Sequence, residues 1–334
     1  MELLRFNILT TFQCNRFCEG CYSPHTNVFL SSELAQDVAK MITKMAEREE
    51  AQRTEIHFFG GETFLNIEPV FNIMDYLSEN CPSFVKSDTM IFTNGDFLSK
   101  DTLQEVKLRQ AKILLNPACD NLEDVEKKMT FIKNICGGVS LSVALNSLNM
   151  KRLPELVKLA IKHDSHIRIS RLYQGGKDPQ YVKEYEIQMV KALNLLLEAE
   201  KPMWPNFVVD TIYPTWKGKK NPYGCGKTLV VIDPDGKLRG CGSDVNSEVG
   251  TIEKCSDYRI SDFEFPNRMS AKKYPECQKC PWVVWCQGGC PYTSKIVYGE
   301  YGVGKTPFCS ALKTIFPLLM KLVEKWELRN DPKN

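Results

Sequence analysis

Cysteine carries most of the chemical information in this chain of 334 residues, which contains 14 of them. Cys14, Cys18 and Cys21 form a CxxxCxxC motif near the start, and eight more cysteines lie between Cys225 and Cys309. Thiolates are soft ligands that favour iron-sulfur clusters, zinc and copper(I). No export signal opens the chain, so grouped thiols indicate metal sites before disulfides. Iron-sulfur chemistry is therefore our leading hypothesis.

Composition and charge argue against several other classes of protein. Lysine plus arginine number 43 and aspartate plus glutamate 41, so the net charge of +2 gives no global field that would attract nucleic acid. No apolar stretch in the sequence is long enough to span a bilayer. We expect a cytoplasmic protein with neither a nucleic-acid nor a membrane partner.

Short apolar runs alternate with longer amphipathic ones through the first half of the chain. This is the pattern of a parallel sheet wrapped by helices. Six strands are predicted, at residues 3–11, 55–59, 89–93, 111–115, 139–145 and 166–172. The first helix is expected after Ser31, because a serine cap precedes apolar residues at helical spacing from Leu34 to Met45. The predicted fold class is α/β, a partial (β/α)6 barrel.

Three polar motifs follow the ends of predicted strands, which is where β/α barrels place their chemistry. The CxxxCxxC motif follows the first strand, Gly-Gly-Glu at 60–62 follows the second, and Thr-Asn-Gly at 93–95 ends the third. Three thiolates can hold an iron-sulfur cluster and leave one iron open to a small molecule. Paired glycines let a ligand approach the backbone, and Glu62 can accept a hydrogen bond from an ammonium group.

The first two motifs, in this order and at these strand ends, resemble the radical S-adenosylmethionine superfamily. The resemblance implies that Cys14, Cys18 and Cys21 hold a 4Fe-4S cluster whose free iron binds the amino and carboxylate groups of S-adenosylmethionine. One electron then cleaves the sulfonium to methionine and a 5'-deoxyadenosyl radical, which removes a hydrogen atom from the substrate. The residues expected to bind S-adenosylmethionine are Gly60, Gly61, Glu62, Asn94, Ser142 and Asn146. For the last two a second interpretation, polar caps at a strand end, stays open.

Two positions depart from the usual pattern of this superfamily. Gly20 stands before the third cysteine, where many members carry an aromatic residue, and Tyr22 follows that cysteine instead. The fourth strand runs into Leu-Asn-Pro-Ala at 115–118, where relatives often show Ser-Asp-Gly. We therefore assign no ribose contact to the fourth strand and expect the adenine contacts to differ in detail.

The last third of the chain resembles the seven-cysteine SPASM domain. Residues 229–238 read as a hairpin around a Pro-Asp-Gly turn. The resemblance implies two auxiliary 4Fe-4S clusters, which makes three clusters in all. Zinc is the alternative metal for these cysteines. The first auxiliary cluster would be held by Cys225, Cys241 and Cys290, and the second by Cys277, Cys280, Cys286 and Cys309. Cys255 lies in the gap between these groups, and its role as a fourth ligand of the first cluster stays open.

A domain boundary is expected near the glycine- and lysine-rich residues 217–222. We expect the radical S-adenosylmethionine partial barrel at residues 1–215, the SPASM domain at 216–310 and a C-terminal helix at 311–334. Apolar residues between Leu312 and Val323 would form the packing stripe of that helix. Cys81, Cys119 and Cys136 have no partner at metal-ligand spacing and are expected to be core or surface residues.

Proteins that combine these two domains mostly modify a side chain of a peptide or protein. Our first hypothesis is an oxidoreductase that matures a ribosomal precursor peptide, by oxidative crosslinking or a related change, with a flavodoxin or ferredoxin as electron donor. Because the chain begins at its first strand, recognition of a leader peptide would need a separate protein or the barrel itself. The sequence does not reveal a general base.

Two other enzymatic functions are kept as alternatives. The first is formation of formylglycine in a sulfatase, and the second is a radical dehydrogenase of a small molecule. Sulfatase maturases carry an aspartate directly after the cysteine that matches Cys241. This chain has Gly242 there, and Asp244 is the nearest acid, so we rank formylglycine formation below crosslinking. A plain electron carrier would leave the Gly-Gly-Glu motif unexplained.

Overall fold

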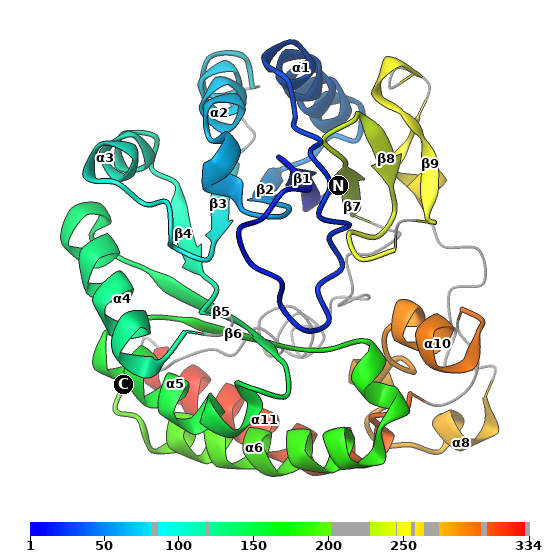
Figure 1. The fold of residues 1–334 in the computed structure, drawn as a ribbon. Coiled ribbons are helices and arrows are strands. Elements are labelled where there is room, and N and C mark those ends of the chain that lie inside the picture. Colours follow the sequence, from blue (N-terminus) through cyan, green and yellow to red (C-terminus); the bar gives the residue numbers. More distant parts are fainter. Residues whose placement is uncertain are drawn as a thin grey trace.

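The computed structural model describes residues 1–81, 86–117, 120–201, 228–244, 246–254, 258–263, 274–301 and 306–330. Its centre is a curved parallel sheet, as the sequence predicts (Figure 1). Six strands follow the chain across this sheet: β1 (Leu4–Leu9), β2 (Arg53–Phe59), β3 (Lys86–Thr93), β4 (Lys112–Leu115), β5 (Ser140–Leu145) and β6 (Ile167–Arg171). All five pairings between consecutive strands, from β1 with β2 to β5 with β6, are parallel, which confirms the predicted α/β fold.

Helices cover the convex face of the sheet, each reached from the strand before it (Figure 1). They are α1 (Ser32–Arg48), α2 (Glu68–Asn80), α3 (Lys100–Leu108), α4 (Leu122–Cys136), α5 (Leu153–Lys162) and α6 (Pro179–Glu198). The predicted cap of α1 is confirmed, since Ser31 Oγ accepts a hydrogen bond of 3.1 Å from the backbone N–H of Leu34. Val38, Ile42 and Met45 are buried on its inner face. Among the described residues, no helix is both long and apolar enough to cross a membrane.

Short one-turn 3-10 helices connect several of these elements. They are η1 (Thr63–Asn66), η2 (Met150–Arg152), η3 (Gln174–Lys177), η5 (Ile252–Lys254) and η6 (Ile260–Phe263). The first of them directly follows the Gly-Gly-Glu motif, and the carboxylate of Glu62 accepts a hydrogen bond of 3.0 Å from the backbone N–H of Phe64. Glu62 therefore also caps the N-terminus of η1, the turn that leads to α2.

The predicted hairpin forms and extends the same sheet. Its strands β7 (Leu229–Ile232) and β8 (Lys237–Arg239) are antiparallel and are followed by β9 (Glu248–Thr251). β7 also pairs in parallel with β1, so the hairpin that precedes Cys241 is hydrogen-bonded to the strand that leads to Cys14. The predicted domain boundary after residue 215 lies outside the described residues and stays a prediction.

The C-terminal part of the chain is helical. It contains α8 (Pro275–Gln278), α9 (Val283–Cys286), α10 (Pro291–Tyr298) and α11 (Cys309–Asn330). α11 packs along α6 on the outside of the barrel (Figure 1). The predicted packing stripe is confirmed, because Leu312, Ile315 and Leu319 are buried in this contact. Trp282 stacks on Phe316 of the same helix with ring centroids 5.5 Å apart.

The concave face of the sheet is polar and only partly covered. Along β5, Leu141, Val143 and Leu145 are buried against the helices, while the alternate residues from Ser140 to Ala144 are half-buried. Elsewhere on this face lie Asn7 of β1, His57 of β2, Phe92 of β3 and Arg168 of β6. Arg168 lies over the Phe92 ring, 5.4 Å from its centroid, and His57 is 5.8 Å from that ring. The barrel interior therefore has a lining that can bind polar groups.

The Gly-Gly-Glu motif continues the pairing of β1 with β2 beyond both strands. Gly61 N–H donates to the carbonyl oxygen of Thr11 at 2.7 Å, and Glu62 N–H donates to that of Gln13 at 2.9 Å. A Cβ atom on Gly61 would lie 2.0 Å from the Gln13 oxygen. Gly60 has φ +143°, and a Cβ atom there would lie 2.3 Å from the Thr11 oxygen. The glycines thus let the segment that leads to Cys14 lie directly on the motif.

Replacing Gly61 with alanine should destabilise the protein, because a rigid backbone carbonyl occupies the space of the new methyl group. We expect the free energy of unfolding to fall by about 1–3 kcal/mol, the usual cost of overpacking. Urea unfolding measures this difference. The matched control is Gly138→Ala, since a Cβ atom at Gly138 would meet nothing within 4 Å. Equal losses in the two variants would contradict the close approach.

His57 should make the folded protein sensitive to acid. Burial, with the charges of Arg5 and Arg168, holds the pKa of His57 well below its ordinary value of 6.5. The unfolded chain therefore binds a proton before the folded one does, and stability falls as the pH drops below 6.5. The contribution is at most about 1.4 kcal/mol per pH unit. Urea unfolding between about pH 7 and pH 5.5 should give a shallower slope for His57→Gln than for the parent, and an unchanged slope would contradict the assignment.

Candidate functional site

The CxxxCxxC segment forms a loop at the carboxyl end of β1, which crosses the mouth of the barrel (Figure 1). The backbone N–H of Arg16 donates to Cys14 Sγ at 3.4 Å, and that of Cys21 donates to the carbonyl oxygen of Cys18 at 3.1 Å. Burial raises the pKa of the Cys14 thiol, and the nearby charges of Glu62 and Cys21 raise it further. Glu62 and Cys21 therefore act electrostatically on Cys14, and Cys18 lies in the same turn as Cys21.

The three thiols of the cysteine loop are of the donor type that holds an iron-sulfur cluster. Among the residues that the structure describes, no group of three His, Cys, Asp or Glu side chains converges on a point where one metal ion could bind. In a 4Fe-4S cluster each thiolate binds a different iron, so its ligands lie farther apart than the ligands of one ion. The thiols of Cys14, Cys18 and Cys21 have the soft-donor chemistry of iron-sulfur ligands.

Glu62 joins the ends of β2 and β3. Its side chain is buried, with 1% exposed. One carboxylate oxygen accepts from Thr93 Oγ1 at 2.6 Å, and the other accepts from the backbone N–H of Asn94 at 2.7 Å. Burial raises the pKa of Glu62, and these hydrogen bonds oppose that shift. A carboxylate offers about four acceptor positions and these contacts, with the one from Phe64, fill three, so about one remains for a ligand.

Asn94 holds the cysteine loop from the end of β3. Its amide nitrogen donates to Asn15 Oδ1 at 2.9 Å and lies 3.9 Å from Cys14 Sγ. Its amide oxygen accepts from the backbone N–H of Asp96 at 2.9 Å. The structure therefore brings Asn94 together with the predicted cluster ligands, but as a support of the loop.

A network of charged side chains, which the sequence analysis did not identify, fixes the segment between Cys14 and Cys18. Arg16 forms ion pairs with Asp96 at 2.5 Å and Asp120 at 2.8 Å, and Lys128 bridges the same two carboxylates at 2.7 and 2.9 Å. Burial alone would raise the pKa of Asp96, but hydrogen bonds from Arg16, Lys128 and Asn15 outweigh it and hold that pKa well below its usual value. The loop is thus anchored to the ends of β3 and β4.

The two remaining candidates for the cofactor pocket lie on β5 and just after it. Ser142 is half-buried on the concave face. Asn146 is buried, and its side-chain oxygen accepts from the backbone N–H groups of Leu148 at 3.0 Å and Asn149 at 2.9 Å. These bonds are those of a polar cap at a strand end, the second of the two interpretations that the sequence left open.

The unusual Gly20 has a structural reason. It has φ +72°, and a Cβ atom there would lie 2.5 Å from the Gln174 side chain and 2.7 Å from that of Leu172. Tyr22 turns instead to the barrel interior, where its ring lies edge-on to Phe59 with centroids 6.3 Å apart.

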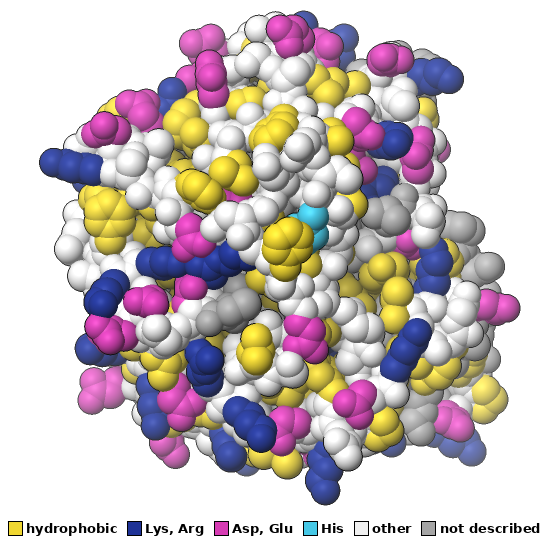
Figure 2. Space-filling model, viewed as in Figure 1, with side chains coloured by type: hydrophobic (Ala, Val, Ile, Leu, Met, Phe, Trp, Pro, Cys, Tyr) yellow, Lys and Arg dark blue, Asp and Glu magenta, His cyan; other side chains and the backbone are white. Residues whose placement is uncertain are grey.

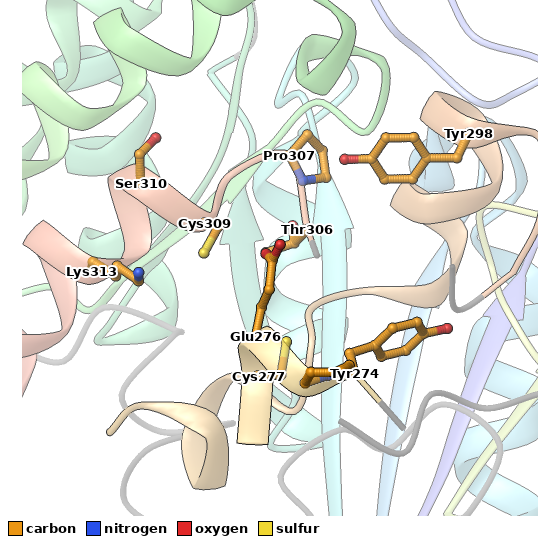
Figure 3. Close-up of a pocket in the computed structure, with 10 residues that line it drawn as sticks. Tyr274, Glu276, Cys277, Tyr298, Thr306, Pro307, Cys309, Ser310 and Lys313 are labelled. Atoms are coloured by element: carbon orange, nitrogen blue, oxygen red, sulfur yellow. The ribbon is translucent and has the colours of Figure 1, made fainter. Parts of the chain in front are cut away.

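Three of the four predicted ligands of the second auxiliary cluster come together. Burial raises the pKa of Cys286 to about 11, and the neighbouring thiols of Cys309 and Cys277 contribute to the shift. Cys277 and Cys309 lie on the wall of a cavity of about 840 Å³, with Glu276 beside them (Figure 3). Cys280 follows in the same turn, where its N–H donates to the carbonyl oxygen of Cys277 at 3.0 Å.

The predicted ligands of the first auxiliary cluster are described only in part. Cys241 is buried at the end of the hairpin, and Cys290 precedes α10. Both are neighbours of Tyr292, whose pKa is raised first by burial and then by the charges around it. Cys225 and Cys255 lie outside the described residues, so the whole ligand set stays a prediction.

Comparison with known proteins bears on the fold and on the first cysteine motif. A family described as a 4Fe-4S single cluster domain matches residues 5–134, which include the cysteine loop and the Gly-Gly-Glu motif. No curated protein matches the sequence. Among solved structures, anSMEcpe with bound AdoMet and Cp18Cys peptide superposes with a TM-score of 0.76 at 16% identity, covering 98% of this chain and 99% of that one.

A second solved structure, SuiB from Streptococcus suis, has a TM-score of 0.64 at 15% identity. The match covers 92% of this chain and 77% of SuiB. At identities of 15% and 16%, the similarity shows a shared fold and nothing further. The chain therefore shares the fold of anSMEcpe and SuiB, and its residues 5–134 are similar to the 4Fe-4S single cluster domain family.

Proposed function

We propose that the chain is a radical S-adenosylmethionine oxidoreductase that modifies a side chain of a ribosomal peptide. The observation that carries this proposal is the anchored cysteine loop, which lies at the mouth of a barrel whose concave face carries polar side chains such as His57 and Arg168. Its bound 4Fe-4S cluster would supply the electron that cleaves S-adenosylmethionine to a hydrogen-abstracting radical. Cys14, Cys18 and Cys21 would hold that cluster.

The residues around the loop would position the cofactors. Glu62, with one acceptor position left, can receive the methionine ammonium of S-adenosylmethionine. Gly60 and Gly61 would support the cofactor indirectly, because their backbone contacts with residues 11–13 hold the cysteine loop in place. The AdoMet in the solved anSMEcpe structures supports this assignment of the cofactor.

The substrate would enter the barrel interior. The Arg168 guanidinium on the concave face lies over the Phe92 ring, and His57 Nε2 has no hydrogen-bond partner among the described residues. Both can bind polar groups of a peptide. The Cp18Cys peptide in anSMEcpe supports a peptide as the substrate class. A separate leader-binding protein and a flavodoxin or ferredoxin as electron donor complete the proposal.

The auxiliary cysteines suit a net oxidation. Removal of one hydrogen atom leaves a substrate radical, which must lose a further electron to give a stable oxidised product. We propose that Cys277, Cys280, Cys286 and Cys309 hold one acceptor cluster and that Cys241 and Cys290, with Cys225, hold another. Cys255 stays open as a further ligand of the latter.

Formylglycine formation is the second candidate. Its support is the likeness to anSMEcpe, an anaerobic sulfatase maturase, along nearly the full length of both chains. The residues that follow Cys241 argue against formylglycine formation. Gly242 has no side chain to act as a base, and a Cβ atom there would lie 3.3 Å from the Phe59 ring. Asp244 is buried in an ion pair with Lys295 at 3.1 Å and a hydrogen bond with Tyr301, so its carboxylate is already engaged.

Alanine at Cys14, Cys18 and Cys21 together should abolish release of 5'-deoxyadenosine under anaerobic conditions with dithionite. It should also remove about four of the roughly twelve irons expected for three clusters. Iron analysis and chromatography of the products measure both effects. Cys136→Ala serves as the control, because this half-buried thiol lies on α4, away from the loop. Release of 5'-deoxyadenosine by the triple variant would contradict the assignment.

Mass spectrometry of candidate peptides should separate the two functions. We expect a short precursor peptide to lose two hydrogen atoms without gaining an aldehyde, because crosslinking removes hydrogen and adds no oxygen. A sulfatase-derived peptide carrying Cys or Ser is the matched substrate, and a hydrazine probe reports any formylglycine. Conversion of the sulfatase peptide alone would favour the second candidate, and turnover of small metabolites alone would contradict both.

A further inference from the structure

Arg171 places a positive charge where the barrel meets the cysteine-rich part of the chain. It is the last residue of β6, on which Ile167 and Ile169 are buried against the helices. Because side chains alternate along a strand, Arg171 leaves β6 on that same outer side. Its guanidinium carbon lies over the Phe308 ring, 4.6 Å from the centroid. Phe308 is fully buried and directly precedes Cys309, a predicted ligand of the second auxiliary cluster.

Two elements hold the Arg171 side chain in place. The first is the turn before α11, which carries Phe308, because a cation over the face of an aromatic ring is an attractive arrangement. The second is α6, whose Tyr185 is buried and meets Phe308 edge-on with ring centroids 5.5 Å apart. Burial raises the pKa of Tyr185, and the charge of Arg171, with a hydrogen bond between the two side chains, opposes that shift. The charge is therefore fixed in position.

The field of this charge reaches the proposed cluster ligands. Burial raises the pKa of Cys286 to about 11, and the positive charge of Arg171 opposes that shift. The charges of Cys309 and Cys277 act on the same thiol in the other direction. Arg171 therefore acts electrostatically on the group of thiols that contains three of the four ligands predicted for this cluster.

Aromatic side chains limit the access of water to this region. Phe308 and Phe316 have at most 1% of their surface exposed. Trp282 stacks on Phe316, and Trp285, which precedes Cys286, lies 5.5 Å from Trp282 between ring centroids. On the face shown in Figure 2, by contrast, lysine, arginine and acidic side chains are interspersed at the surface, where water and salt screen them. A charge beside this aromatic layer therefore acts more strongly on its neighbours than a surface charge does.

A fixed positive charge has a definite effect on an iron-sulfur cluster. Thiolate ligands give the cluster negative charge, and one-electron reduction adds one more negative charge. Net charge, hydrogen bonds and solvent exposure set the reduction potential of such clusters. A nearby cation favours the more negative, reduced form and so raises the potential. The oxidation proposed above needs an acceptor of this kind, because the substrate radical must lose one electron that the acceptor gains.

We propose that Arg171 raises the reduction potential of the cluster held by Cys277, Cys280, Cys286 and Cys309 by stabilising its reduced form. This inference rests on the proposed function, in which that cluster accepts one electron from the substrate radical. Arg171 acts through space: it is no ligand, and it keeps its proton and its charge throughout. The competing role is packing alone, in which the side chain only fills the space between α6 and α11.

A redox titration followed by electron paramagnetic resonance on the cluster-loaded protein tests this role. The signal of the second auxiliary cluster is the one that Cys286→Ala loses. Arg171→Gln should move the equilibrium about tenfold toward the oxidised form, which lowers the one-electron potential by about 59 mV. Arg171→Met, which keeps an unbranched apolar stem, should do the same. Arg171→Lys should stay within about twofold of the parent, because it keeps the charge.

Lys313→Gln is the matched control. Lys313 is exposed on α11 and lines the cavity that also contains Cys277 and Cys309 (Figure 3). Its removal should shift the equilibrium by less than about twofold, since water and salt screen an exposed charge. Equal shifts in Lys313→Gln and Arg171→Gln would overturn the proposal. Equal shifts in Arg171→Gln and Arg171→Lys would also overturn it, because they would show that packing, and not charge, sets the potential.

The inference about Arg171 and the proposed function can fail separately. Loss of about four irons from both uncharged variants would overturn the inference, because Arg171 would then be a structural support. So would a Cys286→Ala variant that keeps all its iron, since no cluster would be held there. If the parent releases no 5'-deoxyadenosine with dithionite, the proposed function fails, and the potentials still decide the role of Arg171.

Discussion

A buried carboxylate at the end of β2 supports the part of the molecule that carries the proposed chemistry. Glu62 accepts hydrogen bonds from Phe64, Thr93 and Asn94, so it joins its own strand to the end of β3. The backbone around it pairs with residues 11–13, just before Cys14. Hydrogen bonds to a buried carboxylate matter because an unpaired charge at this depth would be costly. The cysteine loop thus rests on a carboxylate that three hydrogen bonds hold in place.

The loop is also held at its other side by charge. Arg16, Asp96, Asp120 and Lys128 form a closed set of ion pairs, two cations against two anions, all of them partly shielded from water. Networks of this kind are worth more than isolated surface pairs, since each side chain is fixed by two partners. Together with Asn94 they leave the segment between Cys14 and Cys18 little freedom. A loop prepared in this way does not have to be ordered when a cluster is inserted.

The sequence predicts those parts of the structure that follow from local pattern. Alternating and helical periodicity located six strands, the Ser31 cap, the hairpin after Leu229 and the packing stripe of α11. It could not pair Arg16 with Asp96, because 80 residues separate them and no periodicity links a loop to a distant strand end. It also did not reveal that the backbone of residues 11–13 lies against the paired glycines, whose contact with a ligand stays a prediction. Motifs indicate which chemistry is present, and packing decides which atoms touch.

The parallel pairing of β7 with β1 has a mechanical consequence. The strand that leads to the first cysteine group and the hairpin that leads to Cys241 share one hydrogen-bonded ladder, so the two regions cannot drift apart without breaking it. A shortened protein that stopped before β7 would leave one edge of β1 with unpaired N–H and C=O groups. Exposed strand edges of this kind promote aggregation. The cysteine-rich region is therefore a wall of the barrel and cannot be treated as a detachable appendage.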